Sequence, residues 1–239
     1  MPGKLVTIAV LGLVTSAVCI GAAAAIGGGD FGGGLEGLFE KGPRCHRIEG
    51  ATASTRVLDW DGSDRVQLVA FSNASYTPGT DDKLHASGDP QVLAHLRIRD
   101  GKIDLDCRGW RDRDKLTLTL PGREFRTFAI AGRSDLKLDR LNQAFMKAKI
   151  AGTGTIQANG RVDDLNIEVA GVGHADFAKV TGRSAKVGLA GVGSADIAPT
   201  ESAKIHIAGP STVNLHSDPK DLDTSIAGPG SVHKLGPKD

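Results

Sequence analysis

This sequence has few aromatic residues and almost no excess of positive or negative charge. Of its 239 residues, seven are Phe, two are Trp and one is Tyr. A core with so little aromatic bulk is filled by Ile, Val, Leu and Ala, which suits a narrow interior. Lys and Arg number 29 against 28 Asp and Glu, without a basic tract or basic residues interleaved with aromatics. Nucleic acid is therefore not an expected partner.

Motifs of several enzyme and metal classes are missing too. The sequence has no Gly-x-Ser-x-Gly nucleophile elbow and no nine-residue calcium-binding repeat, which Gly171–Asp176 and Gly191–Asp196 resemble only loosely. Four of its seven histidines, His174, His206, His216 and His233, fall at different positions of the repeat described below, whereas a zinc site needs three or four convergent ligands. The sequence predicts no catalytic set, no metal and no cofactor, although composition alone leaves a Ser-His-Asp assembly open.

What the sequence does contain is a repeat in its second half. The dipeptide Ala-Gly recurs at intervals of 20, 19, 20, 18 and 19 residues, beginning at Ala131, Ala151, Ala170, Ala190, Ala208 and Ala227. A fixed period near twenty residues is typical of a solenoid, in which each coil buries its core only against its neighbours. We therefore predict stacked coils of 18 to 20 residues, about six in number.

The apolar residues of each copy alternate with polar ones, which is the period of a β-strand. Four columns should point inward: Ile130, Ile150, Val169, Leu189, Ile207, Ile226; Phe128, Ala148, Ile167, Val187, Ile205, Thr224; Leu136, Ile156, Ala175, Ala195, Val213, Val232; and Leu138, Ala158, Phe177, Ile197, Leu215. Each coil should offer two short strands and a polar, less regular third side, such as Gly160 to Leu165. The expected fold is an all-β parallel β-helix.

Glycine follows each repeated alanine, where the chain should turn between the strands. These structural turn glycines are Gly132, Gly152, Gly171, Gly191, Gly209 and Gly228. Small residues recur two positions later, as at Gly154 and Gly173. Glycine adopts a positive φ at little cost, so we expect left-handed backbone in these turns.

The first 43 residues differ from the rest. Leu5 to Ile26 is an almost unbroken apolar stretch of 22 residues that ends in a run of alanines. Its length fits a membrane span and its alanines fit a signal cleavage site, so residues 1–26 are predicted to be a signal peptide or a membrane anchor. Either delivers the rest to the periplasm or cell surface. Residues 27–43 are a predicted glycine-rich flexible tether, and 44–239 the β-helix domain.

Residues 44–120 lack the repeat but carry strand signals and two cysteines. Strands are predicted at Thr55 to Asp59, Arg65 to Phe71, Val92 to Ile98, Lys102 to Asp106 and Lys115 to Leu120, with a short helix around Pro90 to Leu96 as an alternative. This region should cap the open end of the solenoid formed by 121–239. Because an exported compartment is oxidising, Cys45 and Cys107 are predicted to form a disulfide.

Three motifs carry a resemblance to a known family: Leu116-Thr-Leu-Thr-Leu-Pro-Gly122, the repeated apolar-Ala-Gly-x-Gly units, and Gly160-Arg-Val-Asp-Asp-Leu-Asn-Ile167. From about Arg56 to Leu235 the chain resembles the head GIN domain family of auto-transporter adhesins. The resemblance implies a β-helical fold and an envelope or surface location, and it supplies no catalytic residues. This chain departs from it by using Ala before the turn glycine, where the family commonly has Ser, and by placing Pro210 and Pro229 in the last two turns.

Three residues form a speculative binding face. Asp176 and Asp196 should occupy the same outward position on adjacent coils, about 5 Å apart, among Lys137, Gln157, Asn214 and His233. Two carboxylates at this spacing suit a retaining glycosidase, but a mixed column is more typical of a solvated face. Trp110 lies beside the charged run Arg111 to Asp114 and could stack on a sugar ring or cover the end of the β-helix.

These features predict a non-catalytic cell-envelope module for adhesion or structure, whose partner is an envelope polysaccharide or a surface protein. Two other functions stay open. One is a polysaccharide lyase or hydrolase that uses Asp176 and Asp196. The other is a regulatory protein that binds a membrane partner. An uncleaved N-terminal segment would add association with the membrane.

Overall fold

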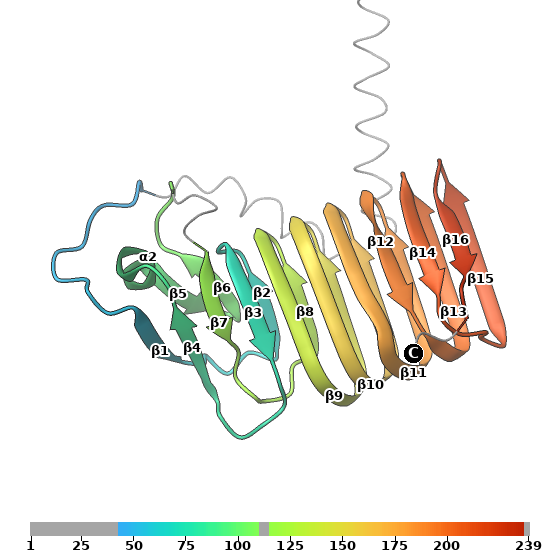
Figure 1. Cartoon of the computed structure of the whole chain (residues 1–239), viewed down its shortest axis with the longest axis horizontal. Coiled ribbons are helices and arrows are strands. Elements are labelled where there is room, and N and C mark those ends of the chain that lie inside the picture. Colours follow the sequence, from blue (N-terminus) through green and yellow to red (C-terminus); the bar gives the residue numbers. More distant parts are fainter. Residues whose placement is uncertain (1–42, 110–114, 237–239) are drawn as a thin grey trace, which may run out of the picture.

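The computed structural model describes residues 43–109 and 115–236. They form a parallel β-solenoid of about five turns, close to the predicted six coils, with a β-rich cap at its N-terminal end (Figure 1). The elements have these bounds: β1 Thr55–Asp59, β2 Arg65–Leu68, β3 Ser72–Tyr76, β4 Lys83–Ser87, α2 Pro90–His95, β5 Leu96–Arg99, β6 Lys102–Leu105, β7 Leu116–Thr119, β8 Thr127–Ile130, β9 Arg133–Ile150, β10 Thr153–Val169, β11 Val172–Leu189, β12 Val192–Ile197, β13 Pro199–Ala208, β14 Ser211–Leu215, β15 Asp221–Ala227 and β16 Ser231–Lys234.

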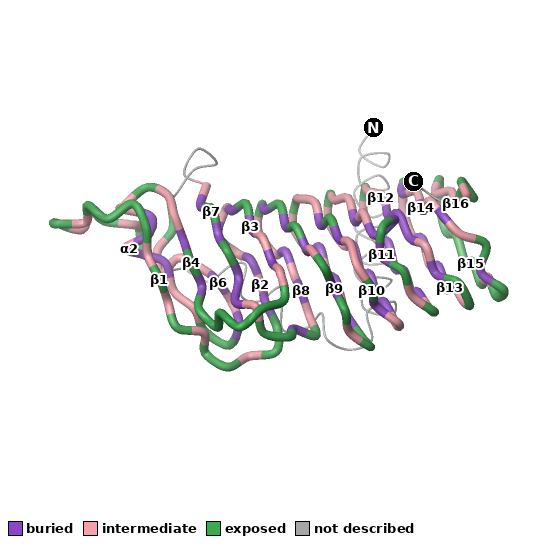
Figure 2. The backbone as a smooth tube through the Cα atoms, turned by 60° about the horizontal axis from the view of Figure 1, so that its bottom comes forward, coloured by how far each residue is buried: buried purple, intermediate pink, exposed green. Residues whose placement is uncertain are grey.

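Three of the four predicted apolar columns are confirmed as ladders of direct partners, and the fourth, from Leu138 to Leu215, is buried throughout. In the first column, Ile130 pairs with Ile150, Ile150 with Val169, Val169 with Leu189, Leu189 with Ile207, and Ile207 with Ile226. All but the last of these are at most 2% exposed, and buried positions recur along every coil except the last (Figure 2). The period of the sequence therefore fixed the register of the sheet, because a shift by one residue would turn each apolar column to the solvent.

The prediction of two short strands and an irregular third side was wrong for three coils. β9, β10 and β11 are continuous strands of 17 or 18 residues that follow the whole coil. Residues assigned to the third side, such as Asp164 and Leu165, pair in register with the next rung. The strand bends at register shifts near Ala158 and Gly182, so bulges turn the corners without ending the ladder.

Most glycines after the repeated alanines have a different role from the one predicted. Left-handed backbone occurs at Gly209 and Gly228, with φ of 139° and 107°, but not at the four earlier positions. At those positions the coils approach one another too closely for a side chain. A Cβ at Gly171, for example, would overlap the carbonyl oxygen of Gly152 on the preceding rung. The repeat thus requires glycine mainly for close stacking.

The cap prediction is confirmed. β1 and β4 are antiparallel to each other, β4 is antiparallel to β7, and β5 is antiparallel to β6, so both walls of the solenoid end in antiparallel strands. α2 begins at Asp89, whose carboxylate accepts from the backbone N–H of Gln91, and it buries Val92 and Leu93 in the core. The Arg56 guanidinium donates to the carbonyl of Leu93 at 2.7 Å. Burial, and then repulsion from Arg97, lowers the pKa of Arg56.

The sequence located four cap strands, at β1, β2, β6 and β7. The helix alternative was correct, because α2 precedes the short strand β5. Two strands were missed: β3 and β4 contain Ser, Asn and Lys and have weak strand signals, yet β3 forms a full rung between β7 and β9. Tyr76, the last residue of β3, belongs to an aromatic cluster with Phe125 and Phe128. The Tyr76 hydroxyl donates to the Arg123 carbonyl, and burial raises the pKa of Tyr76 to about 12.

Between residues 43 and 109 and between 115 and 236, no helix has the length and apolarity needed to cross a membrane. The predicted signal peptide or anchor at 1–26 lies outside the described residues, as does most of the predicted tether.

Candidate functional site

The predicted outward column that contains Asp176 and Asp196 is present in the structure. Lys137, Gln157, Asp176, Asp196, Asn214 and His233 are successive partners in the ladder. The expectation of a solvated carboxylate pair is wrong for Asp196, which is 7% exposed. Its Oδ1 accepts from His216 Nε2 at 2.7 Å and from Asn214 Nδ2 at 3.2 Å. Asp196 is therefore part of an internal hydrogen-bond network and is not a carboxylate in open solvent.

The expectation that no histidines converge is also wrong. His174 and His216 lie on either side of Asp196, and the carboxylate is 3.7 Å from His174 Nε2. His174 Nδ1 lies 2.7 Å from Ser194 Oγ. The His174 ring therefore lies between a serine hydroxyl and the Asp196 carboxylate. The 3.7 Å separation exceeds a hydrogen bond, so the aspartate does not orient the ring as a catalytic triad requires. We interpret this cluster as a polar ladder that stabilises the last coils.

A cleft of about 610 Å³ lies at the other end of the molecule, in the cap, and we call it the arginine cleft. Basic residues dominate its lining, which consists of Arg44, Cys45, His46, Arg47, Asp89, Gln91, Arg108 and Gly109. The lining carries three guanidinium groups and one carboxylate. Trp110, the aromatic residue predicted for the binding face, directly follows this lining in the sequence but lies outside the described residues.

The predicted disulfide between Cys45 and Cys107 is present, and Cys45 lines the arginine cleft. Beside it, Arg44 and Arg108 are partners in an isolated parallel bridge. Backbone hydrogen bonds of 3.0 Å run from Cys45 N to the Arg108 carbonyl and from Arg108 N to the Pro43 carbonyl. Bridge partners project to the same side, so the covalent link holds two arginines next to each other.

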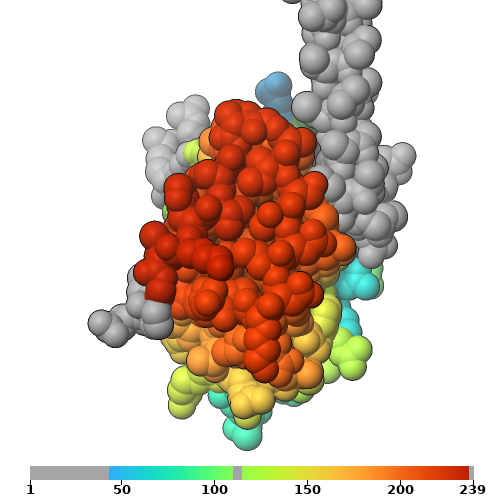
Figure 3. Space-filling view, turned by 90° about the vertical axis from the view of Figure 1, so that its right-hand side faces the viewer, coloured from blue at the N-terminus to red at the C-terminus, as the bar shows by residue number. Residues whose placement is uncertain are grey.

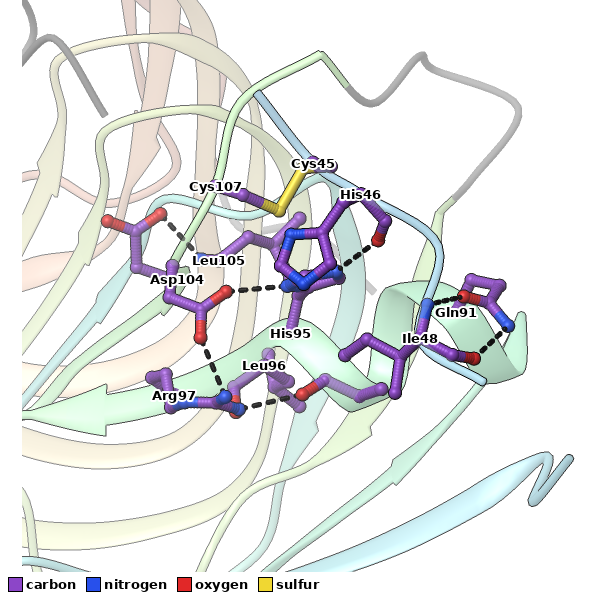
Figure 4. A network of polar contacts seen from close by, with 12 residues as sticks. Cys45, His46, Ile48, Gln91, His95, Leu96, Arg97, Asp104, Leu105 and Cys107 are labelled. Atoms are coloured by element: carbon purple, nitrogen blue, oxygen red, sulfur yellow. Dashed lines mark hydrogen bonds and ion pairs between the residues drawn. A yellow bond between two sulfur atoms is a disulfide. The ribbon is translucent and has the colours of Figure 1, made fainter. Parts of the chain in front are cut away.

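Three further contacts fix segment 43–48 to the cap (Figure 4). The Gln91 side chain joins α2 to Ile48, accepting from its N–H at 2.8 Å and donating to its carbonyl at 3.1 Å. His95 is buried, and its Nε2 lies 3.0 Å from the His46 carbonyl while its Nδ1 lies 2.7 Å from Asp106 Oδ1. Arg97 pairs with the other oxygen of Asp106 at 2.6 Å. The floor of the arginine cleft is therefore preorganised by contacts within the chain.

Among the described residues, none supplies a counter-charge to the cationic side of the arginine cleft. Within residues 43–109 and 115–236, Arg44, Arg47 and Arg108 form no ion pair of 4 Å or less, and all three are exposed. The carboxylate of Asp89 is used in capping α2. Like charges directly opposite each other destabilise a sheet. The arrangement can instead hold an oxyanion, since guanidinium groups bind carboxylate and phosphate with paired hydrogen bonds.

One group in the described part of the chain has the residue types of a metal site, namely His95, Asp106 and Cys107. Its contacts do not fit a metal ion. The Cys107 sulfur is in the disulfide, and both ring nitrogens of His95 already face oxygen acceptors. Metal ligation needs a free thiolate and a nitrogen lone pair.

Sequence reasoning missed the arginine cleft, although a signal was present. Each of the two predicted disulfide partners has an arginine as a direct neighbour, at Arg44 and Arg108. A disulfide brings its flanking residues together, so the pairing of the arginines follows from the pairing of the cysteines. The cap that forms the rest of the lining could not be assembled from strand signals alone.

A family model described as "Putative auto-transporter adhesin, head GIN domain" matches residues 83–219, more than half of the chain. The chain belongs to this family. The match covers the later cap strands and most of the coils of this head GIN domain, and it confirms the resemblance noted in the sequence. Membership in an adhesin family favours a protein without catalytic function that is exported or on the surface.

A solved structure agrees with this fold, and a second one was compared. A putative adhesin from Bacteroides fragilis NCTC 9343 superposes with a TM-score of 0.59 at 16% identity, over 76% of this chain and 96% of that one. A putative lipid binding protein from Parabacteroides distasonis ATCC 8503 gives a TM-score of 0.43 at 15% identity, over 80% and 100% of the two chains. At 16% identity, the Bacteroides fragilis structure shows the shared fold alone. No curated protein matches the sequence significantly.

Proposed function

We propose that this chain is a non-catalytic adhesion module of the cell envelope, whose arginine cleft binds the carboxylate groups of an acidic polysaccharide. One observation carries the proposal: Arg44 and Arg108 are held side by side next to Arg47 and lack a counter-charge among the described residues. A guanidinium group presents two parallel N–H donors that match a carboxylate. The adhesin family supports attachment over turnover.

The dimensions of the arginine cleft favour a polysaccharide over a surface protein as the ligand. A volume of about 610 Å³ suits a small number of sugar rings, whereas a protein partner needs a broad face. A polymer with repeated acidic sugars can also engage many copies of the chain, so weak single contacts add up to firm attachment. The proposal places the module in the periplasm or at the cell surface, with residues 1–26 as its signal or anchor.

The test is co-sedimentation of the detergent-solubilised full-length chain with an insoluble polysaccharide that contains uronic acids. The same polymer with its carboxyl groups reduced to alcohols serves as the second ligand. We expect saturable binding to the acidic form, weakened by salt, and little binding to the reduced form. Arg44→Gln combined with Arg108→Gln should weaken binding roughly 100-fold, because each lost charge-assisted hydrogen bond is worth about 1.5 kcal/mol, or roughly tenfold.

A matched variant separates this site from general charge. Arg123→Gln combined with Arg126→Gln also removes two exposed positive charges, but neither residue lines the arginine cleft, so this variant should bind like the unchanged chain. Equal losses of binding in both double variants would mean that net charge, and not the arginine cleft, determines binding. Equal binding to the reduced polymer would exclude carboxylate recognition. Sugar released into the supernatant would contradict the non-catalytic assignment.

A further inference from the structure

The C-terminal end of the solenoid is open. β15 pairs with β13 and β16 pairs with β14, and on the far side of both strands the described part of the chain supplies no further partner. The core column that is buried elsewhere reaches the surface here: Ile226 is 44% exposed, whereas Ile207 on the rung before is 2% exposed. Figure 3 looks onto this end, which the last coils form, and the tube of β15 in Figure 2 is mostly exposed.

The inward face of β15 carries no charge or proline that would protect this edge. Edge strands are usually blocked by a proline, a bulge or a charged residue that points inward. The sequence of β15 is Asp-Leu-Asp-Thr-Ser-Ile-Ala, and its inward positions are Leu222, Thr224 and Ile226, the continuation of the apolar columns. Its two aspartates fall on the outward face, where Lys204 lies 3.3 Å from Asp223. The strand is thus equipped to accept another strand.

We infer that two copies of the chain associate through their C-terminal ends, with β15 pairing antiparallel to β15 of the second copy about a two-fold axis near Thr224. In this register Leu222 lies opposite Ile226 of the other copy, so the apolar column continues across the junction. Asp223 lies opposite Ser225, and Asp221 opposite Ala227, so no two charges of one sign are direct partners. The pairing is self-complementary, as a two-fold interface requires.

The difference between the two described ends of the solenoid favours a second copy as the occupant of this end. The backbone N–H of Leu235 donates to the Leu215 carbonyl, so the chain up to Gly236 continues the last rung. The opposite end is closed by α2 and antiparallel strands, so it offers no matching apolar cross-section. Association of like ends gives a closed dimer and not a filament.

Cysteine cross-linking tests the register directly in the full-length chain, in detergent, with Cys19→Ser as the background. Thr224→Cys places two thiols opposite each other, at the roughly 4.5–5.5 Å Cα separation of direct antiparallel partners, within disulfide reach. Ser225→Cys is the matched control, because its counterpart lies diagonally at about 7–8 Å. We expect Thr224→Cys to form a covalent dimer at least about tenfold faster than Ser225→Cys.

A second variant tests the association without cross-linking. Thr224→Lys places a charge on the inward side of the edge, where it should convert the dimer to a monomer in analytical ultracentrifugation and leave the circular dichroism spectrum unchanged. A monomeric unchanged chain, or equal cross-linking of both cysteine variants, would overturn the inference. So would capture by Thr224→Cys of a different protein, or a dimer that survives Thr224→Lys.

Discussion

Replacing Gly171 with alanine is expected to lower the free energy of unfolding by roughly 4 kcal/mol, or the melting temperature by about 10 °C. The backbone at Gly171 is not left-handed, so the cost is not one of dihedral angles. The new Cβ would overlap the carbonyl oxygen of Gly152, and that carbonyl accepts the backbone hydrogen bond from Val172 at 3.0 Å. The two rungs must move apart and the hydrogen bond lengthens or breaks.

The loss of stability should extend beyond the turn that contains Gly171. Gly171 itself lies beneath Gly191, whose Cβ would overlap the carbonyl of Gly171 in the same way. Each rung of a solenoid is stabilised by its two neighbours, so a gap weakens the interface that supports the coils on both sides. We therefore expect the loss in a single cooperative thermal transition, measured by circular dichroism.

Gly79→Ala is the matched control for this prediction. Gly79 lies in the cap with ordinary backbone angles, and a Cβ there would have no neighbour closer than 4.0 Å. The substitution should change stability by no more than about 0.5 kcal/mol. If Gly171→Ala proved equally harmless, the coils would be able to slide apart locally, and close stacking would not be the reason for the repeated glycine.

The sequence determined the fold more fully than the site, and particular residues show why. The columns through Ile150 and Ile156 could be read in advance because a strand has a period of two and the coil a period near twenty, so the register follows from counting. The burial of Asp196 could not be predicted by counting along the repeat. It depends on His216, which belongs to the next rung and a different column, and only the packed side chains show that the imidazole covers the carboxylate.

The arginine cleft shows a different limit. Its floor requires a helix, a buried histidine and a disulfide to meet, from segments around residues 45, 91 and 107 that no repeat relates. Strand propensity predicted Thr55 to Asp59 correctly but missed Ser72 to Tyr76, where a polar sequence becomes a strand because rungs on both sides pair with it. Tertiary context overrides local preference most strongly where the sequence is not periodic.

Replacing Cys45 and Cys107 with serine should have a similarly large effect on stability and a further effect on binding. The disulfide joins residues 62 positions apart, and closing a loop of that length stabilises the folded state by about 4 kcal/mol on the loop-entropy model. The loop contains β1 to β6 and α2, which is the cap that covers the N-terminal end of the core. Without the link, we expect this cap to open before the coils do, as a separate early phase in denaturant unfolding.

The same substitution is expected to abolish binding of acidic polysaccharide at temperatures where the coils remain folded. Arg44 and Arg108 repel each other, and two backbone hydrogen bonds are a weak restraint against that repulsion once the covalent link is gone. Hydrogen exchange should show residues 43–48 losing protection while β10 and β11 keep theirs. Retained binding by the serine variant would mean that Gln91 and His95 are sufficient to hold the segment. The chain would then use the disulfide for stability alone, and adhesion would not depend on an oxidising compartment.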